Sequence, residues 1–344
     1  MELGTIIITG HSHGNSSQSV RGNGKLSRTL SGNSSLILWD ILGRSVLQRT
    51  IYRLRDAGLG LISVFNHENR VGKAQPEAWE KTVLDYARSG VERILLLSLG
   101  AYSEIDFNDL LRFHANSGCV VTNVSDDQGP LGISVIEAKA LDSEGLVRNR
   151  LSALASCSSS YEFSGYCNRL DTAADYRRLT LHGLTGLCQL KPVGREIGPG
   201  IWMGDGARIN KSARVLGPAY VGAGSRLRPG VFVAGGSSIE RNCDIDCGTV
   251  IENSSILPRT YLGPGLHVSQ SLVNGSRLTH LGRNLEVELA ETNLLGWTGN
   301  RASRRLLETL GSLFTFGTEP APTLSTPSRA PASLDYVRSQ GFFD

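Results

Sequence analysis

The chain lacks most of the features that mark membrane, secreted and nucleic-acid-binding proteins. No apolar run approaches the ~20 residues of a membrane-spanning helix, and the start Met1-Glu2-Leu3 has neither the basic residues nor the apolar stretch of a secretory signal. No run of Lys or Arg exceeds two residues, and the formal net charge is +3. These absences argue against a membrane and against nucleic acid as the main partner, and they predict a cytoplasmic protein.

Cysteine is also sparse, because the chain of 344 residues has only six. Cys243 and Cys247 are the only two that lie close together. A structural zinc site takes four ligands, and this pair lacks two of them. We therefore expect a packing role for Cys243 and reduced thiols throughout.

The most regular feature of the sequence lies between residues 197 and 257. An aliphatic residue recurs there at every sixth position, and a mostly small residue follows each one by four positions. The aliphatic series is Ile197, Met203, Ile209, Val215, Val221, Leu227, Val233, Ile239, Ile245, Ile251 and Leu257. Such repetition is typical of solenoids, because each unit is too short to bury its apolar face alone. The spacing predicts a parallel β-helix with these side chains inside.

Strand and helix signals alternate before residue 190. Strands are predicted at 5–9, 61–65, 93–97 and 119–124, and helices at 46–54, 78–87 and 107–115. Ser45 is placed to begin the first helix and Asp106 to cap the third, and His114 is expected at the surface. Short connections between alternating elements predict parallel βαβ units, and hence a Rossmann-like three-layer α/β domain with its ligand at the carboxyl ends of the strands.

Three segments, 40–58, 95–118 and 166–176, together carry a family resemblance. They are similar to the helix after the Pro-Lys-Pro signature, the strand, metal turn and helix of the active site, and the Tyr-Trp-x-Asp-x-Gly-Thr-Pro-x-x-Tyr segment of the sugar-1-phosphate nucleotidyltransferases. These enzymes, also called NDP-sugar pyrophosphorylases, include mannose-1-phosphate guanylyltransferase and glucose-1-phosphate thymidylyltransferase. The hexad period resembles the hexapeptide repeat of left-handed β-helices.

The resemblance implies how the chain is divided. We expect a nucleotidyltransferase-like α/β domain over 1–188 and a left-handed parallel β-helix of hexapeptide repeats over 189–282. Residues 283–316 are predicted to form a cap, with a strand-like stretch at 285–289, residues 294–297 over the open end of the solenoid and a short helix over 301–313. Residues 317–344, which are rich in Pro, Ser, Thr and Ala over most of their length, predict a mostly disordered tail.

The family joins a nucleoside triphosphate to a sugar 1-phosphate and releases pyrophosphate. The resemblance therefore implies Mg²⁺ held by carboxylates, basic side chains on the phosphates and a glycine-rich loop. In the family's register, Gly22 and Gly24 fall on the two loop glycines. Leu26 falls on the phosphate-binding arginine and Leu36 on the sugar-phosphate lysine. Two positively charged residues are thus replaced by aliphatic ones.

The two metal-binding aspartates of the family fall on Gly100 and Arg169. Glycine has no side-chain ligand, and a guanidinium repels the cation that a carboxylate would hold. The resemblance thus implies a catalytically degenerate member without a metal cofactor. We expect it to bind a nucleotide sugar or a nucleoside triphosphate, or to act as a regulatory or assembly subunit in sugar-nucleotide or polysaccharide biosynthesis. It would pair with itself or with an active paralogue through the β-helix.

Two other functions remain open. The first is an active, Mg²⁺-dependent nucleotidyltransferase with relocated ligands, which would use Lys25, Arg28 and Asp171. A helix-capping or surface role is the alternative for Asp171. The second is a hexapeptide-repeat acyltransferase, which needs a loop histidine as base, and within the coils only His267 qualifies. The alternative for His267 is an ordinary corner residue, because no loop insertion interrupts the hexads.

Overall fold

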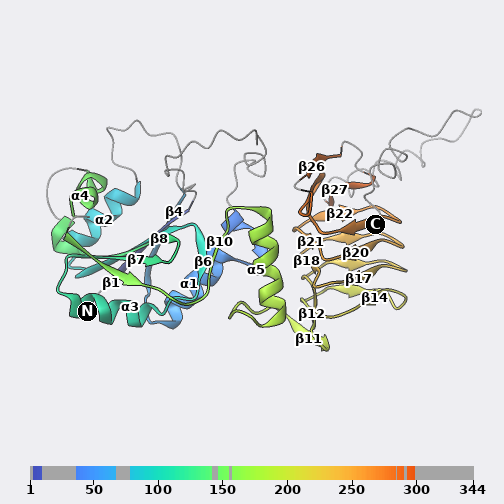
Figure 1. Cartoon of the computed structure of the whole chain (residues 1–344), viewed down its shortest axis with the longest axis horizontal. Coiled ribbons are helices and arrows are strands. Elements are labelled where there is room, and N and C mark those ends of the chain that lie inside the picture. Colours follow the sequence, from blue (N-terminus) through green and yellow to red (C-terminus); the bar gives the residue numbers. More distant parts are fainter. Residues whose placement is uncertain are drawn as a thin grey trace, which may run out of the picture.

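The structure is a computed structural model that describes residues 3–9, 36–66, 78–141, 146–154, 157–283, 285–289 and 293–298. Two units lie side by side (Figure 1). An α/β unit ends with helix α5 (Ala173–Thr185), and a unit built of short strands begins at β11 (Arg195–Gly198). The predicted helix over 301–313 and the predicted tail over 317–344 lie outside the described residues.

The α/β unit is built around a six-stranded sheet of order β4-β1-β5-β8-β7-β9. Its strands are β1 (Leu3–Thr9), β4 (Leu61–Asn66), β5 (Arg93–Leu99), β7 (Val121–Asp126), β8 (Gly129–Glu137) and β9 (Ser158–Glu162). β1 is parallel to β4 and β5, but β8 is antiparallel to both β5 and β7. The predicted parallel arrangement is therefore wrong at β8. Pro130 and Gly132 interrupt the apolar alternation of this strand, so its sequence resembles a turn.

Helices cover both faces of this sheet. α1 (Val46–Asp56), α3 (Phe107–Ser117) and α5 share one apolar core with it, and α2 (Ala78–Arg88) and α4 (Val147–Leu154) share another. Consecutive side chains of β1 alternate between the two cores, because Ile7 belongs to the first and Ile6 and Ile8 to the second. The predicted three-layer α/β organisation is thereby confirmed. Among the described residues, no helix is long and apolar enough to cross a membrane.

The starts of two helices follow the predicted caps. Ser45 caps α1 in a reciprocal capping box with Gln48, and the Asp106 carboxylate accepts hydrogen bonds from the backbone at the start of α3. His114 contradicts its expected surface position, since it is buried on the inward face of α3. Its ring nitrogens lie 2.7 Å from Thr122 Oγ1 and 3.1 Å from Glu137 Oε1.

The second unit is a three-sided solenoid of parallel strands. One side follows the order β11-β12-β15-β18-β21-β24-β25-β26, the second β13-β16-β19-β22-β27 and the third β14-β17-β20-β23. The parallel strands are β12 (Ile201–Met203), β13 (Arg208–Ile209), β14 (Arg214–Val215), β15 (Ala219–Val221), β16 (Arg226–Leu227), β17 (Phe232–Ala234), β18 (Ser238–Ile239), β19 (Asp244–Ile245), β20 (Val250–Glu252), β21 (Ser255–Ile256), β22 (Thr260–Leu262), β23 (His267–Ser269) and β24 (Ser271–Asn274). Ile201 pairs with Ala219. One coil therefore takes 18 residues, from 201 to 219, or three hexads.

The hexad positions of the middle coils fill the solenoid interior. The buried aliphatic side chains there are Val221, Leu227, Val233, Ile239, Ile245 and Ile251. Several small residues hydrogen-bond to the next coil, as when Ser225 Oγ donates to the Glu240 carbonyl at 2.7 Å and Thr249 Oγ1 to that of Gly263 at 2.6 Å. These bonds satisfy carbonyls that water cannot reach. Cys243 occupies such an inward position and is buried, which confirms its predicted packing role.

Both ends of the predicted aliphatic series need correction. Ile197 is 46% exposed, because β11 pairs antiparallel with β12 instead of joining a coil. At the other end the register shifts, since Ser238 pairs with Ser255, which is 17 residues away. Ile256 therefore fills the interior, and Leu257 packs in the core of the α/β unit. This corner is one residue shorter than those before it. A strict six-residue period therefore assigns the wrong residue to the interior beyond it.

The last strands cover part of the solenoid. β25 (Arg277–His280) and β26 (Leu285–Glu288) continue the first side antiparallel, and β27 (Leu295–Trp297) pairs antiparallel with β22. The closing strand predicted at 285–289 is thus confirmed by β26, and the stretch 294–297, predicted only to cover the open end, contains β27. These antiparallel strands cover edges of β22 and β24 that would otherwise be open to pairing with another chain.

Candidate functional site

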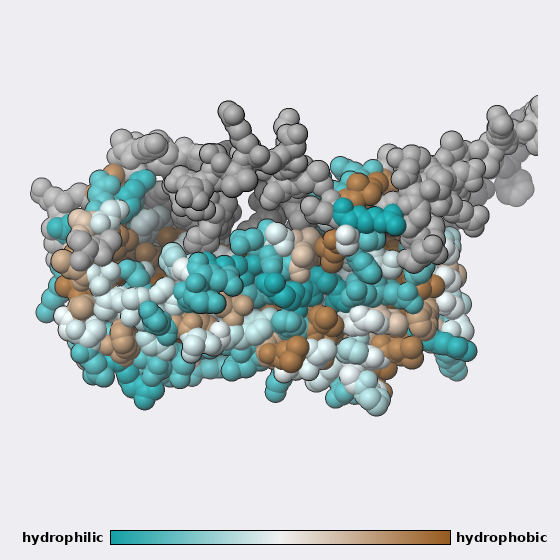
Figure 2. Space-filling model, in the orientation of Figure 1, coloured by the Kyte–Doolittle hydropathy of each residue, from teal (hydrophilic) through white to brown (hydrophobic). Residues whose placement is uncertain are grey.

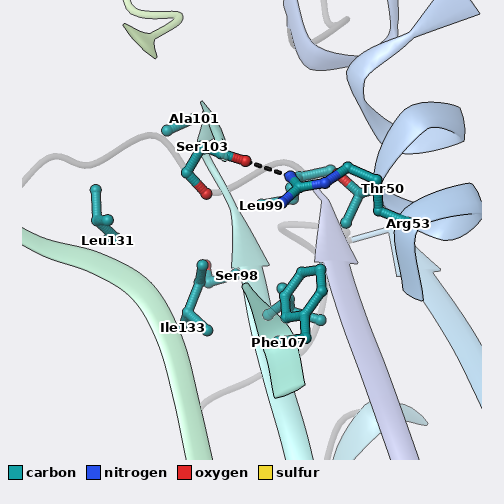
Figure 3. Close-up of a pocket in the computed structure, with 11 residues that line it drawn as sticks. Thr50, Arg53, Ser98, Leu99, Ala101, Ser103, Phe107, Leu131 and Ile133 are labelled. Atoms are coloured by element: carbon teal, nitrogen blue, oxygen red, sulfur yellow. Dashed lines mark hydrogen bonds between the residues drawn. The ribbon is translucent and has the colours of Figure 1, made fainter. Parts of the chain in front are cut away.

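A pocket opens at the carboxyl end of β5, the edge of the sheet at which a ligand is expected (Figure 3). Its walls come from α1, β5, β8 and β6 (Ala101–Ser103), and its lining includes Thr50, Arg53, Ser98, Gly100, Phe107 and Ile133. The free volume is about 10 Å³, room for roughly one water molecule. A nucleotide needs a cavity of about 300 Å³ or more. The pocket therefore marks a candidate site but does not itself accommodate a nucleotide.

Arg53 is the only charged side chain among the described residues that line the pocket. Its guanidinium donates hydrogen bonds to the carbonyls of Ser103 and Ile105 and lies over the Phe107 ring, 5.4 Å from the ring centre (Figure 3). Burial lowers the pKa of Arg53 from its ordinary value, and neighbouring groups oppose this effect. Because both terminal guanidinium nitrogens donate hydrogen bonds to backbone carbonyls, Arg53 stabilises the pocket wall.

The two positions at which the resemblance places metal aspartates are neighbours in the fold. β6 pairs antiparallel with β10 (Cys167–Arg169), and Arg169 lies opposite Ala101, the residue after Gly100. The structure thus brings together two positions that are 69 residues apart, from 100 to 169.

Arg169 is held by the turn between β7 and β8. Its guanidinium forms an ion pair with Asp126 and donates hydrogen bonds to the carbonyls of Gly129 at 3.0 Å and Pro130 at 3.3 Å. Asp126 is mostly buried, with an 8% exposed side chain, so Arg169 is its main source of charge compensation. A carboxylate engaged in this way is not free to bind a second cation.

This donor set does not fit Mg²⁺. The ion takes oxygen ligands in a near-octahedral arrangement, but Gly100 has no side chain and Arg169 is itself a cation. Across the described part of the chain, no group of three or more His, Cys, Asp or Glu side chains could hold a metal ion. We therefore assign no step to a metal at this position.

Asp171, the proposed relocated ligand, is an exposed residue just before α5. Thr172 caps that helix in a capping box with Asp175, so the cap does not belong to Asp171. Asp171 is not among the described residues that line the pocket. Its surroundings agree with the surface role.

The remaining candidates lie elsewhere or cannot be placed. The predicted loop residues Gly22, Gly24, Lys25 and Arg28 lie outside the described residues, as does Leu26. Leu36 begins the short helix η1 (Leu36–Leu38) and is buried in the main core of the α/β unit. His267 lies on β23, where its Nε2 is 3.2 Å from Glu252 Oε2.

Arg53 and Asp126 were not predicted from the sequence. Asp126 had a detectable signal, because it is an acidic residue at the carboxyl end of a predicted strand, where ligand-facing groups gather in α/β sheets. Arg53 had a weaker one. It lies one helical turn after Arg49 on α1, and such a pair is more often a solvated helix face.

Comparison with known proteins gives a short sequence match and a weak structural one. The chain is 36% identical over 83 residues to a UTP--glucose-1-phosphate uridylyltransferase of Synechocystis, a match that covers 24% of this chain and 21% of that protein. A putative glucose-1-phosphate thymidylyltransferase from Bacillus anthracis, solved with sucrose, aligns over 52% of this chain and 94% of its own, with a TM-score of 0.37 and 9% identity. No protein-family model matches the chain.

Proposed function

We propose that this chain is a sugar-1-phosphate nucleotidyltransferase-like protein without metal-dependent catalysis. It would bind a nucleotide sugar or serve as a regulatory or assembly subunit in sugar-nucleotide or polysaccharide biosynthesis. The observation that carries the proposal is the Arg169–Asp126 ion pair, which stands beside Gly100 where a metal carboxylate would be needed. The match to a uridylyltransferase over 83 residues supports the class of protein.

The physical argument rests on what nucleotidyl transfer demands. Two anionic reactants must approach each other in line, and positive charge at the phosphates makes this possible. An arginine already paired with an aspartate contributes little net charge, and a glycine contributes none. Binding of a nucleotide sugar needs fewer such groups than its synthesis. Loss of synthesis is therefore the outcome that the described residues favour, and retention of nucleotide-sugar binding is the part of the proposal that the binding assay tests.

We also infer that the solenoid is a left-handed hexapeptide β-helix through which the chain pairs with itself or with an active paralogue. The six-residue spacing and the three parallel sides support this architecture. Co-purification of a second nucleotidyltransferase-like chain would support the hetero-oligomer. A single monomeric species of the purified chain at micromolar concentration would contradict self-pairing, and absence of any co-purified paralogue would leave the hetero-oligomer without support.

The direct test combines an activity assay with a binding assay on the full chain. Nucleoside triphosphates and sugar 1-phosphates are supplied with Mg²⁺, and pyrophosphate release is expected to stay below about one turnover per minute, far under typical enzyme rates. Nucleotide sugars are then added without metal, and the unfolding temperature is expected to rise, because a ligand selective for the native state stabilises it. If neither pyrophosphate release nor a thermal shift is observed, the nucleotide-sugar part of the proposal has no support.

The second candidate is an active nucleotidyltransferase, which the 36% identity to a uridylyltransferase favours. It would need Mg²⁺ and relocated ligands, for which Lys25, Arg28 and Asp171 are available. Pyrophosphate release that depends on Mg²⁺ and disappears in Asp171→Asn would establish this candidate and overturn the first. Lys25→Ala and Arg28→Ala would then separate phosphate binding from metal binding.

A further inference from the structure

The three sides of the solenoid have different neighbours. The first side packs on the α/β unit, since Tyr220, Leu257 and Leu272 belong to the same buried cluster as Leu42 and Tyr176. We call this buried contact between the two units the junction. Helix α5 stands at the edge of the α/β unit that faces it (Figure 1). The first side of the solenoid is therefore already covered by the chain's own α/β unit.

Hydrogen bonds from both units stabilise the junction. The Arg177 guanidinium of α5 donates to two solenoid carbonyls at 2.8 Å and 3.0 Å. In the opposite direction, the Glu240 carboxylate accepts the two backbone N–H groups of the turn 42–43 at 2.8 Å and 2.9 Å. This turn connects β2 (Asp40–Ile41) and β3 (Arg44–Ser45). These buried contacts make the first side unavailable to a partner chain.

The second side, formed by β13, β16, β19 and β22, carries charged residues. Arg208 and Arg226 are exposed on its first two coils. Arg228 binds Asp244 of the next coil through two contacts of 3.0 Å and 2.9 Å, and Asp246 lies 3.7 Å from the same guanidinium. Because charged side chains are stable in contact with water, this side needs no cover.

The third side, formed by β14, β17, β20 and β23, turns apolar residues outward. We call it the outer side, because it lies away from the α/β unit (Figure 1). Val233 and Ile251 point into the solenoid interior. Their neighbours Phe232 and Val250 therefore point outward, because side chains alternate along a strand. Leu216, which follows β14, is 53% exposed.

These outward apolar residues have no apolar cover in the described part of the chain. Phe232, Val250 and Leu216 neither belong to nor pack against any of the buried apolar clusters formed by the described residues. Phe232 pairs with Val250 in the ladder, and Leu216 N donates to the carbonyl of Val233. Figure 2 shows that apolar residues are exposed on the solenoid among charged ones. Grouped apolar residues on a surface favour contact with another chain.

Opposite charges lie at the two ends of this apolar group. Arg214, Phe232, Val250 and His267 pair in this order along the ladder, one on each of four coils. Arg214 is exposed and forms no ion pair with a described residue. At the other end, Glu252 Oε2 lies 3.2 Å from His267 Nε2, and the Glu252 side chain is 43% exposed. The outer side thus has a cation at one end and a carboxylate at the other.

We propose that the outer side is the surface through which two copies of this chain pair. A two-fold axis that runs along the strand direction between β17 and β20 places Phe232 of one copy against Val250 of the other. The same axis places Arg214 opposite the partner's Glu252, and it makes this charge pair twice. An axis along the solenoid would instead bring the two Arg214 side chains together. Charge complementarity therefore selects the antiparallel orientation of the two solenoids.

This inference rests on one part of the proposed function, the pairing of the chain with itself. It adds the face, the orientation and the charge pair that such pairing would use. The α/β unit lies on the other side of the solenoid from this face (Figure 1). Pairing through the outer side therefore keeps both α/β units, each with its candidate pocket, away from the contact.

Sedimentation of the full chain at about 1 to 100 μM tests the pairing, and the unsubstituted chain is expected to form a dimer. Phe232→Glu should raise the Kd of the dimer about 100-fold, because it places a carboxylate without a partner at the centre of the contact. The matched control is Arg208→Glu, at an exposed position of the second side on the same coil as Arg214. Its Kd should differ from that of the unsubstituted chain by less than about threefold.

An exchange of charges tests the orientation. Arg214→Glu and Glu252→Arg should each raise the Kd about tenfold, because each brings like charges together across the contact. The double variant should return to within about threefold of the unsubstituted chain, since its charges are again opposite. Both positions are on the surface of the solenoid, so this test remains available if Phe232→Glu does not fold.

Two results would overturn the outer side as the contact while leaving self-pairing through another surface. One is a dimer that Phe232→Glu and Arg208→Glu affect equally, and the other is a double variant that pairs no more tightly than the weaker single variant. A chain that remains monomeric at about 100 μM would overturn both the outer side and self-pairing. Pyrophosphate release and nucleotide-sugar binding are measured separately, so none of these results decides that part of the proposed function.

Discussion

At the junction, Arg177, Glu240 and Arg49 each bond to backbone groups across or beside the contact between the two units. At the pocket, Arg53 is the one charged side chain among the described lining residues, and most of the others are apolar or small. Charged side chains are therefore concentrated at the junction and scarce at the pocket. A catalytic site for anionic reactants would show the opposite distribution.

The buried charges at the junction stabilise one relative arrangement of the α/β unit and the solenoid. Placing a charge away from water is costly unless hydrogen bonds satisfy it, and at the junction they do. Removing one partner would leave the others unsatisfied, so the two units have one favoured arrangement. The described residues thus place more buried charge at the contact between the two units than at the pocket.

The largest predicted effect is at Arg177. Arg177→Ala removes four hydrogen bonds and leaves carbonyls on two coils without a donor, and burial at 6% exposure prevents easy repair by water. We expect a loss of about 3 kcal/mol or more in the free energy of unfolding, measured with urea.

Arg178→Ala is the matched control for this measurement. Arg178 is the next residue of α5, but it is exposed and pairs only with Asp175 on its own helix. Its loss should cost less than about 0.5 kcal/mol. Similar losses for the two variants would show that the junction does not depend on Arg177.

A smaller effect is predicted at the turn that Glu240 binds. Gly43→Ala forces a Cβ into the Tyr220 hydroxyl and Val193, at a φ of 93° that favours glycine. Gly58→Ala is the control, because Gly58 has a similar φ of 82° and nothing within 4 Å of the added atom. Gly43→Ala should destabilise the protein by about 2 kcal/mol more than Gly58→Ala in urea unfolding. Equal effects would mean that only backbone strain matters.

The solenoid and the junction differ in how far the sequence predicted them. The solenoid interior follows from neighbouring coils alone, so a six-residue period located Val221 to Ile251 correctly. It failed at Leu257, where one corner is a residue shorter. Nothing in the pattern marks Glu240 as special, because its partners Leu42 and Gly43 lie almost 200 residues earlier. Contacts between distant segments depend on the whole fold, which local periodicity does not contain.

The candidate site was predicted only in part for the same reason. The resemblance assigned Gly100 and Arg169 to two metal positions, and the pairing of β6 with β10 brings these two segments side by side. Asp126, the partner of Arg169, was not identified. Strand β8 was not predicted, so the turn between β7 and β8, which lies next to Asp126, was not predicted either. His114 was misplaced because a histidine at the end of a helix gives no sign that the helix face turns inward.

The smallest predicted effect concerns the pocket and tests the comparison most directly. Arg53, like Arg177, donates to backbone carbonyls, but it is only partly buried, and water can replace it at Ser103 and Ile105. Arg53→Ala should therefore cost about 1 kcal/mol in urea unfolding, well below Arg177→Ala. A loss at Arg53 as large as that at Arg177 would mean that the pocket wall is as strongly stabilised by buried charge as the junction. The contrast between the two regions would then disappear, since both would depend equally on a buried arginine.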